Sequence, residues 1–129
     1  MLMGMALIYS NTGTLSFRQI GMAIVPMFQN GMIMPILVVG TALMLFGIAF
    51  KLSAVPFHTW TSDVYQGAPA PVATFLGSVS KVAMMALGLR FLLSTATLAL
   101  PSINTLIVVI ASLSMIIGNV LALRQQNIK

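Results

Sequence analysis

The chain of 129 residues contains no cysteine and a single acidic residue, Asp63, and only 5% of its residues are charged. Without cysteine it cannot form disulfides, thiolate metal sites or iron–sulfur ligation. With one histidine, His58, and one carboxylate, it also lacks the ligands for a metal cage of its own. We therefore expect no metal site and no cofactor-binding site in this chain.

The scarcity of charge also excludes a soluble domain. Soluble domains average about 25% charged residues, whereas this chain is 59% hydrophobic, which indicates an integral membrane protein. Nucleic-acid binding is excluded because it requires a basic face. The six basic residues are instead dispersed singly: Arg18, Lys51, Lys81, Arg90, Arg124 and Lys129.

Long apolar runs predict an all-α integral membrane fold, with about three transmembrane helices plus a partial first one. Residues 1–10 are too short to cross a bilayer, which takes about 20 residues. Full spans are expected near 32–60, 71–93 and 104–123. We interpret the whole chain, 1–129, as part of one transmembrane domain.

Two other stretches are expected near the membrane surface. Leu15–Phe28 mixes apolar and polar residues and predicts an interfacial amphipathic segment that Pro26 closes. Thr59–Ala70 is polar and predicts a connection between spans. Its Trp60 and Tyr65 are the aromatic types that anchor at membrane interfaces.

Most of the polar chemistry lies between Lys51 and Lys81. Pro56, inside the first full span, lacks an amide donor and clashes with the preceding turn, so the helix is expected to break there. Unpaired backbone at membrane depth is tolerated only against protein or a water-filled cavity. We therefore expect Lys51 to face the protein interior.

Lys51 and Lys81 are the first candidates for a proton relay. A lysine within a span costs about 2.5–3.5 kcal/mol on insertion scales, and intramembrane charges usually mark function. Burial disfavours the ammonium form, which allows proton exchange. The alternatives are snorkelling or an ion pair with Asp63. One carboxylate cannot neutralise two buried lysines, so we expect an acidic partner for Lys51 from outside these residues.

His58 and Asp63 are further candidates close to the break. Histidine changes charge near neutral pH, so His58 is a candidate relay member; the alternative is a hydrogen-bonded helix end. Asp63 either holds the loop or takes part in proton entry.

The residues from Lys51 to Val72, followed by Phe75-Leu76 and Ser80-Lys81, resemble the antiporter-like membrane subunits of respiratory complex I. The run Asp63–Pro69 is particular to the branch of that family formed by subunit N, called chain 2 in mitochondria and chloroplasts. Gly118–Lys129 resembles the same family's next helix and its exit.

This resemblance implies a bundle of two inverted repeats, each with one discontinuous helix that places an ion site at mid-membrane. Lys51 matches the lysine of the first broken helix, and Lys81 matches the central-axis lysine of the next helix. The family's glutamate partner of the first lysine lies on an earlier helix, and its second repeat would follow Lys129. The chain is therefore expected to be a fragment of a larger inverted-repeat bundle.

The implied function is a proton-translocating segment of NADH:quinone oxidoreductase, a translocase, with no redox chemistry in this chain. NAD, FMN, iron–sulfur clusters and quinone are expected in partner subunits. The expected partners are the other membrane subunits of complex I and the lipid bilayer. The expected location is the energy-coupling membrane, in bacteria the inner membrane. Two alternatives stay open: a multisubunit cation/proton antiporter, against which Asp63–Pro71 argues, and a truncated, non-pumping structural fragment.

Overall fold

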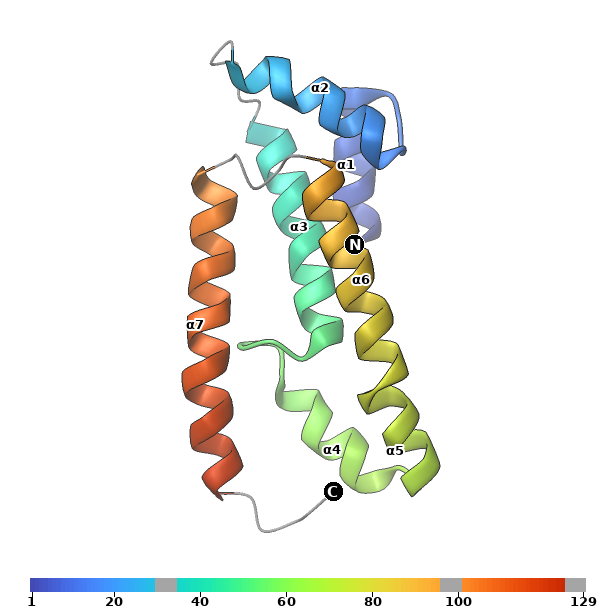
Figure 1. Ribbon diagram of the computed structural model, residues 1–129, viewed down its shortest axis with the longest axis vertical. Helices are drawn as coiled ribbons and strands as arrows, with labels where there is room; N and C mark the ends of the chain where they lie inside the picture. The colour runs from blue at the N-terminus through green and yellow to red at the C-terminus, as the bar shows by residue number, and fades with distance from the viewer. Residues whose placement is uncertain (30–34, 96–100, 125–129) are drawn as a thin grey trace.

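The computed structural model describes residues 1–29, 35–95 and 101–124, and within these ranges every regular element is an α-helix. The predicted all-α fold is therefore confirmed. The helices are shown in Figure 1 and run as follows: α1 Leu2–Thr12, α2 Phe17–Gln29, α3 Pro35–Leu52, α4 Thr59–Gly67, α5 Ala70–Gly77, α6 Val79–Ser94 and α7 Pro101–Arg124.

Three stretches are long and apolar enough to cross a membrane: Pro35–Leu52, Ala70–Ser94 and Pro101–Arg124, with mean hydropathies of 2.0, 1.6 and 2.5. They run along the long axis of the molecule, and successive spans have opposite chain directions (Figure 1). The shorter α1 packs against α3 between Gly40 and Gly47. Three spans with a partial first helix match the prediction.

The first span differs from its predicted range of 32–60. Residues 32–34 lie outside the described residues, and the helix ends at Leu52 rather than near 60. The expectation that Thr59–Ala70 is a connection is wrong, because Thr59–Gly67 forms the separate helix α4. No residue of α4 is buried, so its polar composition reflects an exposed helix and not a loop.

The other two predicted spans are observed with shifted limits. The expected helix 71–93 is found as α5 and α6, which are separated by an interruption at Ser78. The expected helix 104–123 begins at Pro101 and ends at Arg124. Proline in the first turn costs no hydrogen bond, because the first amides of a helix lack intrahelical partners.

Helix α2 lies across the end of the spanning helices (Figure 1). This orientation supports the prediction of an interfacial segment. Pro26 does not close the segment as expected, because α2 continues through it to Gln29. A proline inside a helix removes the hydrogen bond to the carbonyl four residues earlier, which for Pro26 is that of Met22. Met22 is exposed on the surface of the helix.

The hydrophobic core lies at the end of the bundle that α2 crosses. Its buried residues come from α1, α2, α3, α6 and α7: Ile8, Ile20, Ile24, Leu37, Met44, Leu45, Phe91 and Ile103. Phe17 meets Phe91 edge to face, with 5.5 Å between ring centroids. Helices α1 and α3 touch backbone to backbone, since a Cβ on Gly4 would lie 2.6 Å from the Gly40 carbonyl oxygen. Small residues permit such close approach between membrane helices.

Candidate functional site

The first candidate lysine lies where α3 stops. Ser53 adopts a left-handed conformation with φ 63°, and its N–H donates to the Phe50 carbonyl at 3.1 Å. The next N–H, of Ala54, donates to the Ala49 carbonyl at 2.9 Å. This pair of bonds is a Schellman motif, which satisfies the last carbonyls of a helix. Lys51 therefore stands in the last turn of α3, where the partial negative charge of the helix end favours a cation.

The predicted break between Lys51 and Pro56 is confirmed, but Pro56 does not act as expected. The helix has already ended at Leu52, so Pro56 follows the end of the helix and does not kink a continuous one. The Val55–Pro56 peptide bond is cis. The buried N–H of Val55 donates to Ser114 Oγ of α7 at 3.0 Å, and this hydroxyl donates to the Ile110 carbonyl at 2.7 Å. Helix α7 thus provides the partner for a backbone group that the break leaves unpaired.

Four aromatic residues are in contact across the break: Phe46, Phe50, Phe57 and Trp60. Phe50 and Trp60 stack with 5.5 Å between centroids, and Trp60 Nε1 donates to the Phe50 carbonyl at 3.3 Å. Trp60 therefore holds α4 against the end of α3, a role the sequence did not reveal.

Ser53 and His58 are the first and last residues between α3 and α4. Thr61 Oγ1 donates to Ser53 Oγ at 2.6 Å. This bond joins the left-handed residue after α3 to the first turn of α4. His58 is the N-cap residue of α4, and its Nδ1 atom is buried. Among the described residues it is the one buried side-chain polar atom without a hydrogen-bond partner. The predicted part of His58 in a proton relay stays a prediction.

The second candidate lysine also lies beside a helix interruption. Ser78, with φ −108° and ψ −76°, separates α5 from α6, and Lys81 follows in the first turn of α6. Lys81 is half-buried, and its Nζ atom lies 5.7 Å from the centroid of the Tyr65 ring on α4. This is within the range of a cation–π interaction. A Cβ on Gly77 would lie 3.5 Å from Tyr65 Oη, so the Tyr65 side chain reaches the end of α5.

The two lysines lie on neighbouring antiparallel helices at the same end of the bundle. Helices α3 and α6 meet where a Cβ on Gly88 would lie 3.3 Å from Ile48. At 1.5 Å of rise per residue, Lys51 stands about 5 Å and Lys81 about 10 Å past this crossing, in the same direction. The structure therefore places Lys51 and Lys81 at neighbouring heights.

The charged side chains of Lys51 and Asp63, near the break, are both exposed. The prediction that Lys51 faces the protein interior is wrong for this chain, because its side chain is exposed and none of the described helices covers it. Asp63 lies exposed on α4 and forms no ion pair within the described ranges. Metal-binding groups of three or more His, Cys, Asp or Glu are absent from the same ranges. Structural neutralisation of either lysine by Asp63 is thus not seen.

An α-helical membrane protein whose spans are interrupted beside lysines is the class that this geometry defines. The chain belongs to the NADH:quinone oxidoreductase/Mrp antiporter transmembrane family, whose match covers residues 1–129. This confirms the resemblance found in the sequence.

Two curated relatives illustrate the match. The chain is 57% identical over 129 residues to NADH-quinone oxidoreductase subunit N of Psychrobacter arcticus (strain DSM 17307 / VKM B-2377 / 273-4). It is 47% identical over 129 residues to the subunit N of Acinetobacter baumannii (strain AB0057). Each match covers 100% of this chain and 25% of the relative, so the chain spans about a quarter of the length of these proteins.

Proposed function

We propose that this chain forms the centre of a proton pathway in a membrane subunit of NADH:quinone oxidoreductase, which couples electron transfer from NADH to quinone with proton movement. The observation that carries the proposal is the placement of Lys51 and Lys81, each beside a helix interruption, on two adjacent spans. The family match and the names of the two relatives support the same enzyme.

In the proposed mechanism, the stability of a charged lysine depends on the groups that surround it. A lysine surrounded by apolar protein is destabilised as an ammonium ion, whereas the C-terminal end of α3 stabilises a cation at Lys51. In this proposal, Lys51 exchanges its proton only in the complete subunit, where other segments surround its exposed side chain. Like charges disfavour each other at short range, so a proton arriving at one lysine promotes release from the other. His58, whose Nδ1 atom has no hydrogen-bond partner among the described residues, is proposed as a further member of the relay at the break.

The acidic partner of Lys51 and the redox cofactors lie outside this chain. We propose that the rest of the subunit covers the exposed side of Lys51 and provides an acidic side chain there, since Asp63 forms no ion pair in the described part of this chain. NAD, FMN, iron–sulfur clusters and quinone are held by partner subunits, and this chain carries out no redox step. The proposed location is the inner membrane of a bacterium.

The experiment compares charge with titration at Lys81, in the full-length subunit within the assembled complex. Lys81→Arg keeps the positive charge but cannot release its proton, because arginine stays protonated in proteins. We expect Lys81→Arg, Lys81→Ala and Lys51→Ala to lower proton uptake by membrane vesicles at least about tenfold, as loss of a proton-transfer group commonly does. NADH:quinone electron transfer is measured in the same vesicles.

Arg124→Gln, at the exposed end of α7, is the matched control and should pump normally. Wild-type pumping by Lys81→Arg would show that Lys81 does not exchange protons. A cation/proton antiporter is the second candidate, because the family description includes Mrp antiporters. Transport of Na⁺ or K⁺ without any dependence on NADH oxidation would favour it.

A further inference from the structure

The interrupted segment between α3 and α4 is joined to α7 by a backbone hydrogen bond. Three N–H groups of this segment find partners nearby in the chain, either in α3 or within the segment: those of Ser53, Ala54 and Phe57. Pro56 has no N–H to donate. The N–H of Val55 instead donates to Ser114 Oγ of α7, at 3.0 Å and across 59 positions of sequence. This bond therefore fixes the break to a different helix.

Both partners in this bond are held in place. Val55 is 6% exposed, and a buried N–H group requires a partner because water cannot reach it. Ser114 donates its own hydroxyl proton to the Ile110 carbonyl at 2.7 Å, which leaves its lone pairs for the Val55 N–H. A hydroxyl that donates to one helix carbonyl and accepts from the break has a fixed orientation. Ser114 is therefore a specific acceptor.

Ser114 takes a donor that a continuous helix would use elsewhere. In an unbroken α-helix the Val55 N–H would donate to the carbonyl four residues earlier, which is that of Lys51. With Ser114 as the acceptor, α3 ends at Leu52 and Lys51 remains in its last turn. A helix end stabilises a cation only within about the last turn, so the position of the end decides whether Lys51 is stabilised. The Ser114 hydroxyl thus bears on Lys51 through the backbone.

We propose that Ser114 is a positioning residue of the proton pathway: by accepting the Val55 N–H, its hydroxyl keeps α3 interrupted directly after Lys51. The inference rests on the proposed function, in which Lys51 exchanges its proton at this break. Ser114 itself takes up no proton in this role. A purely structural role would change the amount of assembled complex, whereas a positioning role also changes the proton transfer of each complex that assembles.

The test uses the full-length subunit in its assembled complex and compares two substitutions of nearly equal shape. Ser114→Thr keeps the hydroxyl, whereas Ser114→Val replaces it with a methyl group. Proton uptake by membrane vesicles is measured and divided by the amount of assembled complex on native gels. We expect Ser114→Thr to pump as wild type. Ser114→Val should pump about fivefold less, because an unpaired buried N–H disfavours the break by at least about that factor.

Hydrogen exchange of the Val55 amide, followed by mass spectrometry, checks the contact itself. This amide should exchange slowly in the wild type and in Ser114→Thr, and at least about fivefold faster in Ser114→Val. Rapid exchange in the wild type would overturn the proposal, because the bond would then not exist in the complete complex. If Ser114→Val fails to assemble, Ser114→Ala takes its place, since it removes the hydroxyl without adding volume.

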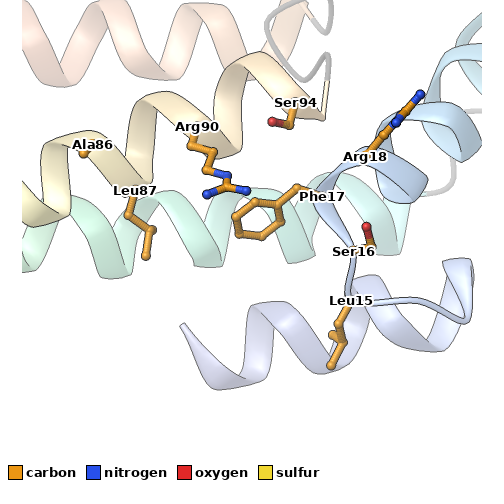
Figure 2. Close-up of a pocket in the computed structure, with 8 residues that line it drawn as sticks. All are labelled: Leu15, Ser16, Phe17, Arg18, Ala86, Leu87, Arg90 and Ser94. Carbon is orange, nitrogen blue, oxygen red and sulfur yellow. The ribbon is translucent and has the colours of Figure 1, made fainter.

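Two control variants separate the hydroxyl from a general loosening of the bundle. Ser112→Val changes a serine on another face of α7 that makes the same hydroxyl-to-carbonyl bond within the helix. Leu87→Ala removes packing beside a hollow of about 550 Å³ between α2 and α6, whose lining Figure 2 shows. This hollow lies at the opposite end of the bundle from α4 (Figure 1). Both variants should pump as wild type per assembled complex.

Lys51→Ala, measured in the same vesicles, separates this inference from the proposed function. Loss of pumping by Lys51→Ala together with normal pumping by Ser114→Val would overturn the role of Ser114 alone. Normal pumping by Lys51→Ala would refute the proton pathway at the break, and the role of Ser114 with it. Equal impairment of Ser114→Thr and Ser114→Val would assign the effect to side-chain shape, and the hydroxyl would then have no positioning role.

Discussion

The end of the bundle that α2 crosses contains the buried hydrophobic core, whereas helices α4 and α5 at the other end bury no residue. Two phenylalanines illustrate this difference: Phe91 of α6 is 1% exposed and Phe75 of α5 is 57% exposed. Helices α4 and α5, which are described in full, contain no buried residue. We call the first region the packed end and the second the open end.

Both candidate lysines belong to the open end, where this chain alone cannot exclude water or hold a charge in apolar surroundings. The packed end contributes most of the stability within the chain, and it fixes α3 and α6 side by side. The two tasks are therefore separated along the same helices. The buried core lies at one end, and the proton transfer that we propose at the other end depends on surfaces that the rest of a larger protein supplies.

The largest expected effect tests this separation directly. Phe91→Ala removes a fully buried ring that contacts Phe17, and should cost about 3–5 kcal/mol, as large core truncations do. The expected result is severe loss of the assembled complex from membranes, measured by native gel electrophoresis. Phe75→Ala, the matched change at the open end, should lower assembly less, because this chain itself does not bury the Phe75 ring. Equal losses from both changes would mean that the open end is packed as tightly in the complete protein.

A smaller effect is expected where α7 supports the break. Ser114→Ala removes the hydroxyl that accepts the buried Val55 N–H, and leaving that donor unpaired costs about 1–3 kcal/mol. We expect a lower temperature of thermal inactivation for the complex and faster proteolysis at the break. Ser112→Ala is the control, because Ser112 makes the same hydroxyl-to-carbonyl bond within α7 but is exposed. An unaltered Ser114→Ala complex would exclude this contact as a support.

The smallest effect concerns the ring beneath Lys81, and it depends on Lys81 being part of the relay. Tyr65→Leu removes a cation–π contact, which is worth about 0.5–1 kcal/mol, or roughly a two- to fivefold change in occupancy of the ring-bound position. We expect fewer protons taken up per NADH oxidised in membrane vesicles. Tyr65→Phe keeps the ring and should restore the wild-type ratio. If leucine and phenylalanine behave alike, the ring does not position Lys81.

The sequence predicted the spans because a bilayer accepts only long apolar helices, so hydropathy alone locates them. It located the break through Pro56. The chain instead leaves α3 at Ser53, which has a left-handed backbone although it is not glycine, the residue that usually marks this conformation. It missed α4 because exposed polar helices and loops have similar compositions. The division of the second span at Ser78 also has no local signal as strong as proline.

The contacts around the lysines were the least predictable part of the site. Val55 and Ser114 are 59 positions apart, and their hydrogen bond depends on how α7 packs against the break. Tyr65 carried an ordinary signal for a membrane-interface anchor, and only the fold brings its ring to Lys81. The roles of Lys51, Lys81, His58 and Asp63 stay predictions that the experiments above address.

The end of α3 at Leu52 also affects how the chain enters the membrane as it is synthesised. Because Lys51 is the penultimate residue of α3, this segment presents an uninterrupted apolar stretch to the translocon, with its charge at the trailing end. Ala70–Ser94 instead carries Lys81 near its middle, where a lysine costs about 2.5–3.5 kcal/mol to insert. Since α3 precedes it, a partner helix is already in the bilayer when the costly segment arrives. The order of synthesis therefore supplies a neighbour to the span that most needs one.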